Sequence, residues 1–152
     1  MRYIIIIVLA LASLAFMGAT CAPSEYGQAS WGGVEQERAQ LGLPSLAWDD
    51  GLAGIANARA GYLADNTIFT HEGWQDYWLC VPVGTRIAEL LGRQPLMEQP
   101  DAVWYGWQYS PIHYAQVISP VYRYAGFAAY VGSDGWVYEA LWMSSQPSTC
   151  VP

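Results

Sequence analysis

The hydrophobic period of this chain changes once, and that change restricts the fold to a few architectures. Over residues 31–65 and 101–118, apolar side chains recur every three or four residues, as they do on helices with one buried face. Residues 122–131 and 136–143 are instead rich in aromatic and β-branched side chains, and Ser133-Asp134-Gly135 between them is a turn sequence. Helices followed by an antiparallel hairpin predict a layered α+β domain.

Residues that begin or end helices bound the expected helical segments. Gly42 and Pro44 end the first segment, and the carboxylate of Asp49 can cap the second. Residues 69–83 show no regular period, so we expect an ordered loop there. Helices are expected over 31–41, 49–65, 101–109 and 112–118.

The start of the chain has the pattern of a targeting segment. Arg2 precedes an apolar run over residues 3–17, which has the length of a signal-peptide core and falls short of the ~20 residues that a membrane span needs. The chain has 152 residues in all, the size of one ordinary domain. We therefore predict export, with a signal peptide over 1–22, a small polar tether over 23–30 and one domain over 31–152.

The end of the targeting segment remains open between two alternatives. Cys21 stands where a lipoprotein carries its lipid, although Gly18 and Thr20 are unusual residues before such a cysteine. Cleavage as late as Ala29, after the small residues of Gly27-Gln28-Ala29, would instead remove Cys21. Membrane contact is expected only if Cys21 is lipidated. In either case the expected location is outside the cytoplasm, and the expected state is a monomer.

Charge and aromatic content restrict the partners of the protein. The chain has 13 acidic residues, 6 arginines and no lysine, with a net charge of −7, so its surface repels the phosphates of nucleic acids. We therefore exclude nucleic acid as a partner. The chain also has 8 Trp, 11 Tyr and 3 Phe, which predicts a core filled with large rings. The alternative is that some rings line an exposed groove for an apolar or sugar ligand.

The three cysteines fit an oxidising compartment. Outside the cytoplasm thiols oxidise, so Cys80 and Cys150 are expected to form a disulfide, with Cys21 lipidated, removed or left unpaired. The bridge would close a loop of about 70 residues and stabilise the fold by about 2–4 kcal/mol. The cysteines are too few and too widely separated for a metal site.

Several segments, taken in order, are similar to a known family. They are Arg38-Ala39-Gln40-Leu41-Gly42-Leu43-Pro44-Ser45-Leu46, Leu46-Ala47-Trp48-Asp49, Phe69-Thr70-His71 and the stretch from Trp107 to Ile118. Over residues 31–144 the chain resembles the CAP superfamily, which comprises cysteine-rich secretory proteins, the insect-venom antigen-five group, plant pathogenesis-related proteins and bacterial exported relatives. The resemblance implies an α-β-α sandwich with a large open cleft.

The resemblance also supplies the candidate site. His71 and His113, the only two histidines of the chain, match the two cleft histidines of the family. In many members these histidines and two acidic residues bind zinc or a similar cation. Imidazole nitrogens are good ligands for such metals, and carboxylates complete the site.

The acidic positions of the family are not acidic here. Thr85, in Gly84-Thr85-Arg86, stands where the first glutamate is expected, and Ser110 stands where many members place the second. Glu72 and Glu139 are the remaining candidate carboxylates. The alternative for Glu72 is a solvated loop charge, and for Glu139 an exposed strand face. We therefore expect an incomplete site that binds zinc or another divalent cation only weakly, and no resident cofactor.

Three functions fit these observations. The first is a non-enzymatic extracellular binding module that holds a lipid, a sterol, a cell-wall fragment or a partner protein in the two-histidine cleft. The second is a hydrolase or peptidase, either metal-assisted or of the serine type. Ser110 and His113 would form the nucleophile pair, but no orienting carboxylate stands at a known spacing. The third is a structural envelope protein.

Overall fold

A computed structural model describes residues 20–21 and 24–150 of the chain. The expected signal peptide lies outside these residues except for Thr20 and Cys21, so its cleavage and the lipidation of Cys21 stay predictions. In the described part, no helix is both long and apolar enough to cross a membrane.

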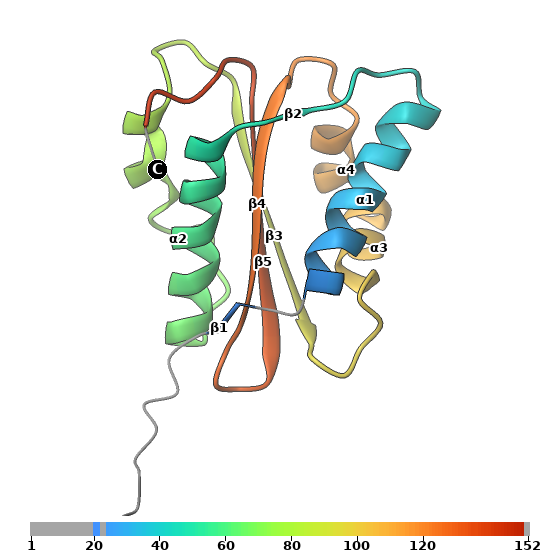
Figure 1. Ribbon diagram of the computed structural model, residues 1–152, viewed down its shortest axis with the longest axis vertical. Helices are drawn as coiled ribbons and strands as arrows, with labels where there is room; N and C mark the ends of the chain where they lie inside the picture. Colours follow the sequence, from blue (N-terminus) through green and yellow to red (C-terminus); the bar gives the residue numbers. More distant parts are fainter. Residues whose placement is uncertain (1–19, 22–23, 151–152) are drawn as a thin grey trace, which may run out of the picture.

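The described chain forms three layers, with a sheet between two layers of helices (Figure 1). In chain order the elements are β1 (Thr20–Cys21), α1 (Ser24–Gln40), β2 (Ala47–Trp48), α2 (Asp50–Asn66), the 3-10 helix η1 (Trp74–Cys80), β3 (Ile87–Pro95), α3 (Ala102–Tyr109), α4 (Pro111–Val117), β4 (Tyr124–Val131) and β5 (Trp136–Ser144). The α+β class and the α-β-α sandwich are thereby confirmed.

The sheet is built around the hairpin at the end of the chain. Its strand order is β1-β4-β5-β3, and the short β2 also pairs with β4. Strands β4 and β5 are antiparallel, and β3 runs antiparallel to β5 at the edge of the sheet. Helix α2 covers one face, while α1, α3 and α4 cover the other (Figure 1). Strand β3 is therefore an edge strand, with helices on both of its faces.

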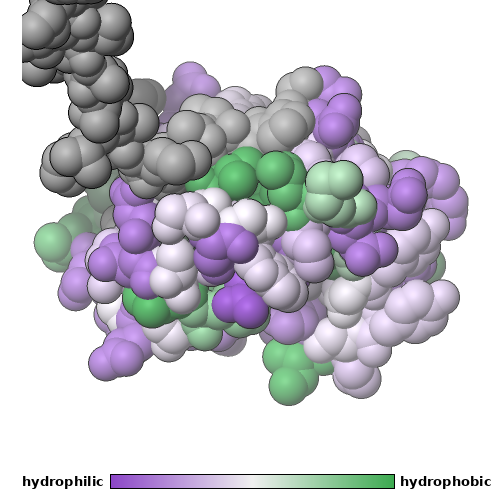
Figure 2. Space-filling model, turned by 90° about the horizontal axis from the view of Figure 1, so that it is seen from below, coloured by the Kyte–Doolittle hydropathy of each residue, from purple (hydrophilic) through white to green (hydrophobic). Residues whose placement is uncertain are grey.

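Each face of the sheet has its own core. Toward α1 and α3 the core contains Val34, Leu90 and Trp107, and toward α2 it contains Leu52 and Trp142. Seen from the end with the β4–β5 turn, the surface is largely hydrophilic, and hydrophobic residues form a few separate patches (Figure 2). The heavy aromatic content is thus used partly in the core, as expected.

Glycine at position 126 lets α2 lie directly on the sheet. A Cβ atom at Gly126 of β4 would lie 2.0 Å from the backbone nitrogen of Ala53 in α2. No flexible side chain could move aside, because the obstacle is helix backbone.

Two expectations for local structure are wrong. Helix α1 begins at Ser24, so residues 24–30 belong to the helix and are not a tether. Tyr26 and Ser30 of that segment are buried against the sheet. Sequence analysis predicted no element for residues 84–99, and β3 lies within this range. The expected ordered loop over 69–83 contains the short helix η1.

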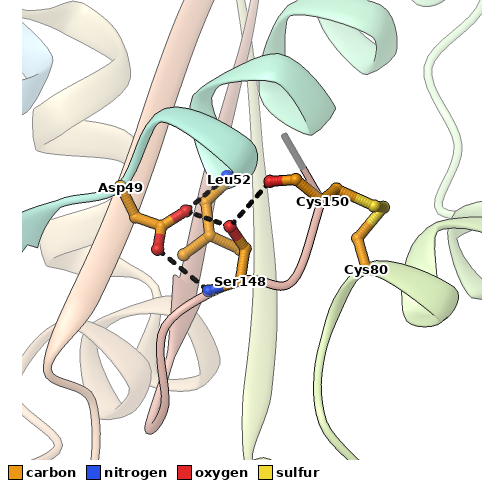
Figure 3. Close-up of a disulfide and its surroundings, with 5 residues drawn as sticks. All are labelled: Asp49, Leu52, Cys80, Ser148 and Cys150. Carbon is orange, nitrogen blue, oxygen red and sulfur yellow. Dashed lines mark hydrogen bonds between the residues drawn. A yellow bond between two sulfur atoms is a disulfide. The ribbon is translucent and has the colours of Figure 1, made fainter. Parts of the chain in front are cut away.

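The disulfide between Cys80 and Cys150 is confirmed, with their Cα atoms 4.8 Å apart (Figure 3). Nearby, the Asp49 carboxylate caps α2 by accepting a hydrogen bond from the backbone N–H of Leu52 at 2.8 Å. The same carboxylate accepts hydrogen bonds from the backbone N–H and the hydroxyl of Ser148 (Figure 3). Burial alone would raise the pKa of Asp49, but these hydrogen bonds outweigh burial and lower it. The C-terminal segment is therefore fastened to the start of α2 as well as to η1.

Candidate functional site

Two neighbouring hollows lie along the edge strand β3. One, of about 240 Å³, is lined by His113 and Ser110, and the other, of about 210 Å³, is lined by His71, Trp74 and Glu89. The loop after α2 contributes to both, because Phe69 lines the first hollow and His71 the second. We call the two hollows together the histidine cleft.

A buried ion pair holds His71 in place. Glu89 Oε1 lies 2.8 Å from His71 Nδ1, and Glu89 Oε2 lies 3.0 Å from Arg59 Nε. The side chains of Arg59 and Glu89 are 2 % and 1 % exposed, whereas that of His71 is 53 % exposed. An ionised carboxylate only accepts hydrogen bonds, so Nδ1 of His71 carries a proton and donates it to Glu89. The imidazole of His71 is thus exposed to solvent, and its contact with the buried Glu89 fixes its orientation.

The local fold explains how these groups meet. Arg59 lies on the buried face of α2, one turn after Ile55 and one turn before Leu63. Its guanidinium also donates a hydrogen bond to the backbone carbonyl of Thr70, which fixes the loop that carries His71. Glu89 lies on β3, two residues before the buried Leu91, and so faces the same helix.

The second histidine is positioned by the junction of two helices. Helix α3 ends at Tyr109, Ser110 is the N-cap of α4, and Pro111 takes the first helical position. His113 Nδ1 lies 2.9 Å from Ser110 Oγ. Burial lowers the pKa of His113, and the charge of His71 lowers it further. The two rings are therefore within electrostatic reach of each other, and His113 favours its neutral form.

The structure does not bring all expected site residues into the histidine cleft. Thr85 lines a different hollow with Trp78 and Val83, and its hydroxyl is buried without a hydrogen-bond partner among the described residues. Glu72 is exposed and lines a hollow with Asp76. Neither residue lines the hollows that contain His71 and His113.

Glu139 also lies outside the histidine cleft. It is 0 % exposed, on the face of β5 that packs toward α1, so the alternative of an exposed strand face is wrong. The physical reason is that α1 begins earlier than expected and places Ser30 against this part of β5.

Sequence reasoning missed Arg59 and Glu89. Their positions in the sequence could have indicated them, because each places a charge within an otherwise apolar segment. Arg59 interrupts the apolar stripe of α2, and Glu89 interrupts the apolar run of residues 87–91. Two charges of opposite sign on buried faces indicate a buried ion pair, because an unpaired charge there would be costly.

The donor set of the histidine cleft does not fit a zinc site. The described residues contain no group of three or more His, Cys, Asp or Glu side chains that could hold a metal ion. The Glu89 carboxylate holds Nδ1 of His71 and pairs with Arg59, so it orients the ring but supplies no further metal ligand. Structural zinc sites use four protein ligands and catalytic sites use three. We therefore derive no chemistry through a metal.

We expect zinc to bind this protein at millimolar concentrations or not at all. Two imidazoles supply too few ligands and no negative charge to balance a dication. The measurement is calorimetric titration of zinc into the full chain, beside the double variant His71→Ala, His113→Ala. Sub-micromolar binding that disappears in the double variant would contradict this prediction.

The layered fold agrees with the family to which the sequence is matched. The chain belongs to the CAP family, because the model of the cysteine-rich secretory protein family (CAP) matches residues 32–146. No curated protein matches the chain in sequence.

Solved structures support the fold. An outer surface protein from Borrelia burgdorferi superposes with a TM-score of 0.71 at 18 % identity, over 84 % of this chain and 98 % of that protein. A cysteine-rich secretory protein from Staphylococcus aureus gives a TM-score of 0.62 at 19 % identity, over 82 % of this chain and 39 % of that one. An extracellular protein with an SCP domain from Bacillus anthracis gives a TM-score of 0.54 at 19 % identity, over 80 % of this chain and 44 % of that one. At such identities the likeness concerns the fold alone.

Proposed function

We propose that this protein is an exported, non-enzymatic binding module that holds an organic ligand in the histidine cleft. The observation that carries the proposal is the lining of the hollow at His113. Polar Ser110 and His113 stand beside the apolar side chains of Phe69, Leu91 and Trp107. The charged Arg93 also lines this hollow. A concave, mainly apolar site with a few fixed polar groups is the general form of small-molecule pockets.

The lining also indicates the class of ligand. Apolar side chains suit the body of a lipid or sterol, while the imidazole and hydroxyl can hydrogen-bond its polar end. An apolar part of a cell-wall fragment or of a partner protein has the same chemistry. Export is supported by the apolar N-terminal run and by the disulfide, and the structural neighbours are themselves described as outer surface, secretory or extracellular proteins.

A serine-type hydrolase is the second candidate, and one contact favours it. Ser110 and His113 are hydrogen-bonded, as a nucleophile and its base would be. However, in the part of the chain that the structure describes, the ring of His113 makes no hydrogen bond to a carboxylate. An imidazole without such a partner lacks the group that fixes its tautomer in serine hydrolases. The binding module is therefore the better supported function.

The proposal is tested by identifying the ligand that co-purifies with the protein. Gly106 of α3 lines the hollow at His113, and a Cβ atom there would meet nothing within 4 Å. Leucine at this position suits a helix and adds bulk to the hollow. We expect mass spectrometry of extracts to show a co-purifying lipid or sterol with the full-length chain and at least tenfold less with Gly106→Leu.

Gly54→Leu is the matched control. Gly54 lies in α2, is exposed, and likewise has open space around a Cβ atom. The Gly54→Leu variant should retain the ligand. Equal ligand in all three proteins would contradict a site in the histidine cleft, and no ligand in any preparation would favour a structural envelope protein. Proteolytic activity that is lost in His113→Ala would favour the hydrolase.

A further inference from the structure

A second groove, separate from the histidine cleft, runs between α1 and α3. It is the largest of the described hollows, at about 520 Å³. On α1 its lining includes Gln28, Gly32, Gln36 and Gln40, which are spaced by four residues and therefore lie in one row along the helix. The row extends for about 18 Å. We call it the α1–α3 groove.

The chemistry of the α1–α3 groove is polar and contains no cation. The residues that line it include no arginine, and the chain has no lysine. A phosphate, sulfate or carboxylate ligand would therefore find no positive partner and would be repelled by Glu37 and Asp101. An extended apolar ligand is also disfavoured, because it would cover amides and carboxylates without hydrogen bonds.

The polar groups divide into a fixed set and a free set. Glu37 is fixed, because it accepts hydrogen bonds from the hydroxyl of Tyr114 at 2.5 Å and from Nε2 of Gln108 at 3.3 Å. In the described part of the chain, the amides of Gln36 and Gln40 make no hydrogen bond to protein. Each free amide offers donors and an acceptor to a ligand.

Aromatic side chains complete the opposite wall. Trp104 is 8 % exposed and stands in the groove beside Tyr105, which is about half exposed. Trp104 is thus largely buried, and Tyr105 is the ring that a ligand can reach. Amide and carboxylate groups beside such a ring suit a ligand that has hydroxyl groups on its edges and C–H groups on its faces. Neutral sugars have both.

Gly32 keeps the middle of the α1–α3 groove open, and packing does not require a glycine there. Glycine inside a helix lowers helix stability relative to alanine. Gly33 is required by packing, since its Cβ would lie 2.5 Å from the ring of Trp104. A Cβ at Gly32 would meet nothing within 4 Å. The residue is therefore unnecessary for the fold, yet it interrupts the row of glutamines and keeps the middle of the groove open.

We infer that the α1–α3 groove binds a neutral oligosaccharide that lies along α1. This site is additional to the one in the proposed function, since the lining residues of the two do not overlap. The row of glutamines would accommodate several sugar rings, with hydroxyl groups on the free amides and one ring face on Tyr105.

The test uses two soluble probes, cellotetraose and chitotetraose, titrated into the full chain and followed by NMR chemical shifts. We expect saturable binding of at least one. Binding of chitotetraose alone would assign the amides to its acetamido groups, and binding of both would assign them to hydroxyl groups. Gly32→Leu should weaken binding at least tenfold while leaving the thermal midpoint unchanged or higher, because leucine favours the helix.

Further variants test the role of the free amides and the location of the sugar. Gln36→Ala, Gln40→Ala removes the free amides without adding bulk and should weaken binding several-fold. Gly54→Leu and Gly106→Leu should bind sugar as the unaltered chain does. No binding of either probe, or binding unchanged in Gly32→Leu, would overturn the inference. Loss of sugar binding in Gly106→Leu alone would place the sugar in the histidine cleft and would equally overturn it, whereas loss of a lipid in that variant bears only on the proposed function.

Discussion

Replacing Cys80 and Cys150 together by alanine is expected to lower the free energy of unfolding by about 2–4 kcal/mol. The two cysteines are 70 residues apart in the sequence, so their bridge restricts a large part of the unfolded chain. In the folded protein the bridge joins the end of η1 to the segment after β5 (Figure 3). Urea denaturation of the full chain at neutral pH measures the difference.

The folded state should survive the loss of the disulfide, because other contacts hold the same segment. The backbone N–H of Thr149 donates to the carbonyl of Cys80 at 2.8 Å, and Ser148 is bound to Asp49. We therefore expect a lower midpoint with the same cooperative transition. Cys21→Ala is the matched control, since it removes a cysteine and leaves the bridge intact. Equal midpoints for the double variant and this control would contradict the prediction.

The helices and the final hairpin could be predicted because their buried residues follow one period. Helix α2 has a regular apolar stripe, and the two strands of the hairpin flank an evident turn. The start of α1 could not be predicted in this way. Its buried positions Tyr26, Ser30, Val34 and Arg38 have helical spacing, but two of the four are polar. Only packing against the sheet shows that they face inward.

The histidine cleft was predictable in part. The resemblance identified His71, His113 and Ser110, and the structure places these three on its two hollows. The carboxylate beside His71 could not be found by matching motif positions. Thr85 occupies the matching position, yet Glu89, four residues further on and turned toward α2, makes the contact. A motif position gives the register of a strand but not which neighbouring side chain reaches the site.

Replacing Glu139 by glutamine is expected to stabilise the protein, and to do so increasingly from pH 5 to pH 8. Burial raises the pKa of Glu139 to about 8, from an ordinary value of 4.5. Both carboxylate oxygens are buried without a hydrogen bond from the described residues, and the hydroxyl of Ser30, the polar group against them, offsets burial only slightly. Neighbouring Gly92 and Ala129 on the paired strands offer no side-chain partner.

The sign of the effect follows from the two protonation states. Below pH 4.5 the carboxyl group is protonated in the folded and the unfolded chain, so it adds no pH dependence. Between pH 4.5 and about 8 the unfolded chain ionises while the folded chain keeps the proton, so each pH unit reduces the free energy of unfolding by about 1.4 kcal/mol. Above about pH 8 both states are ionised and the loss is complete. Glutamine ionises in neither state, so Glu139→Gln does not undergo this loss of unfolding free energy.

Urea denaturation at pH 5, 6.5 and 8 separates the effect of this buried carboxyl group from a general effect of charge. Relative to the unaltered chain, Glu139→Gln should gain less than about 1 kcal/mol at pH 5 and about 4 kcal/mol at pH 8. Glu98→Gln is the matched control, because Glu98 is exposed, and it should follow the unaltered chain at every pH. Parallel pH profiles for the unaltered chain and Glu139→Gln would show that the buried carboxylate has a partner that balances its charge. A Glu139→Gln variant that is less stable at pH 8 would show that the carboxylate itself supports the packing of α1 on β5.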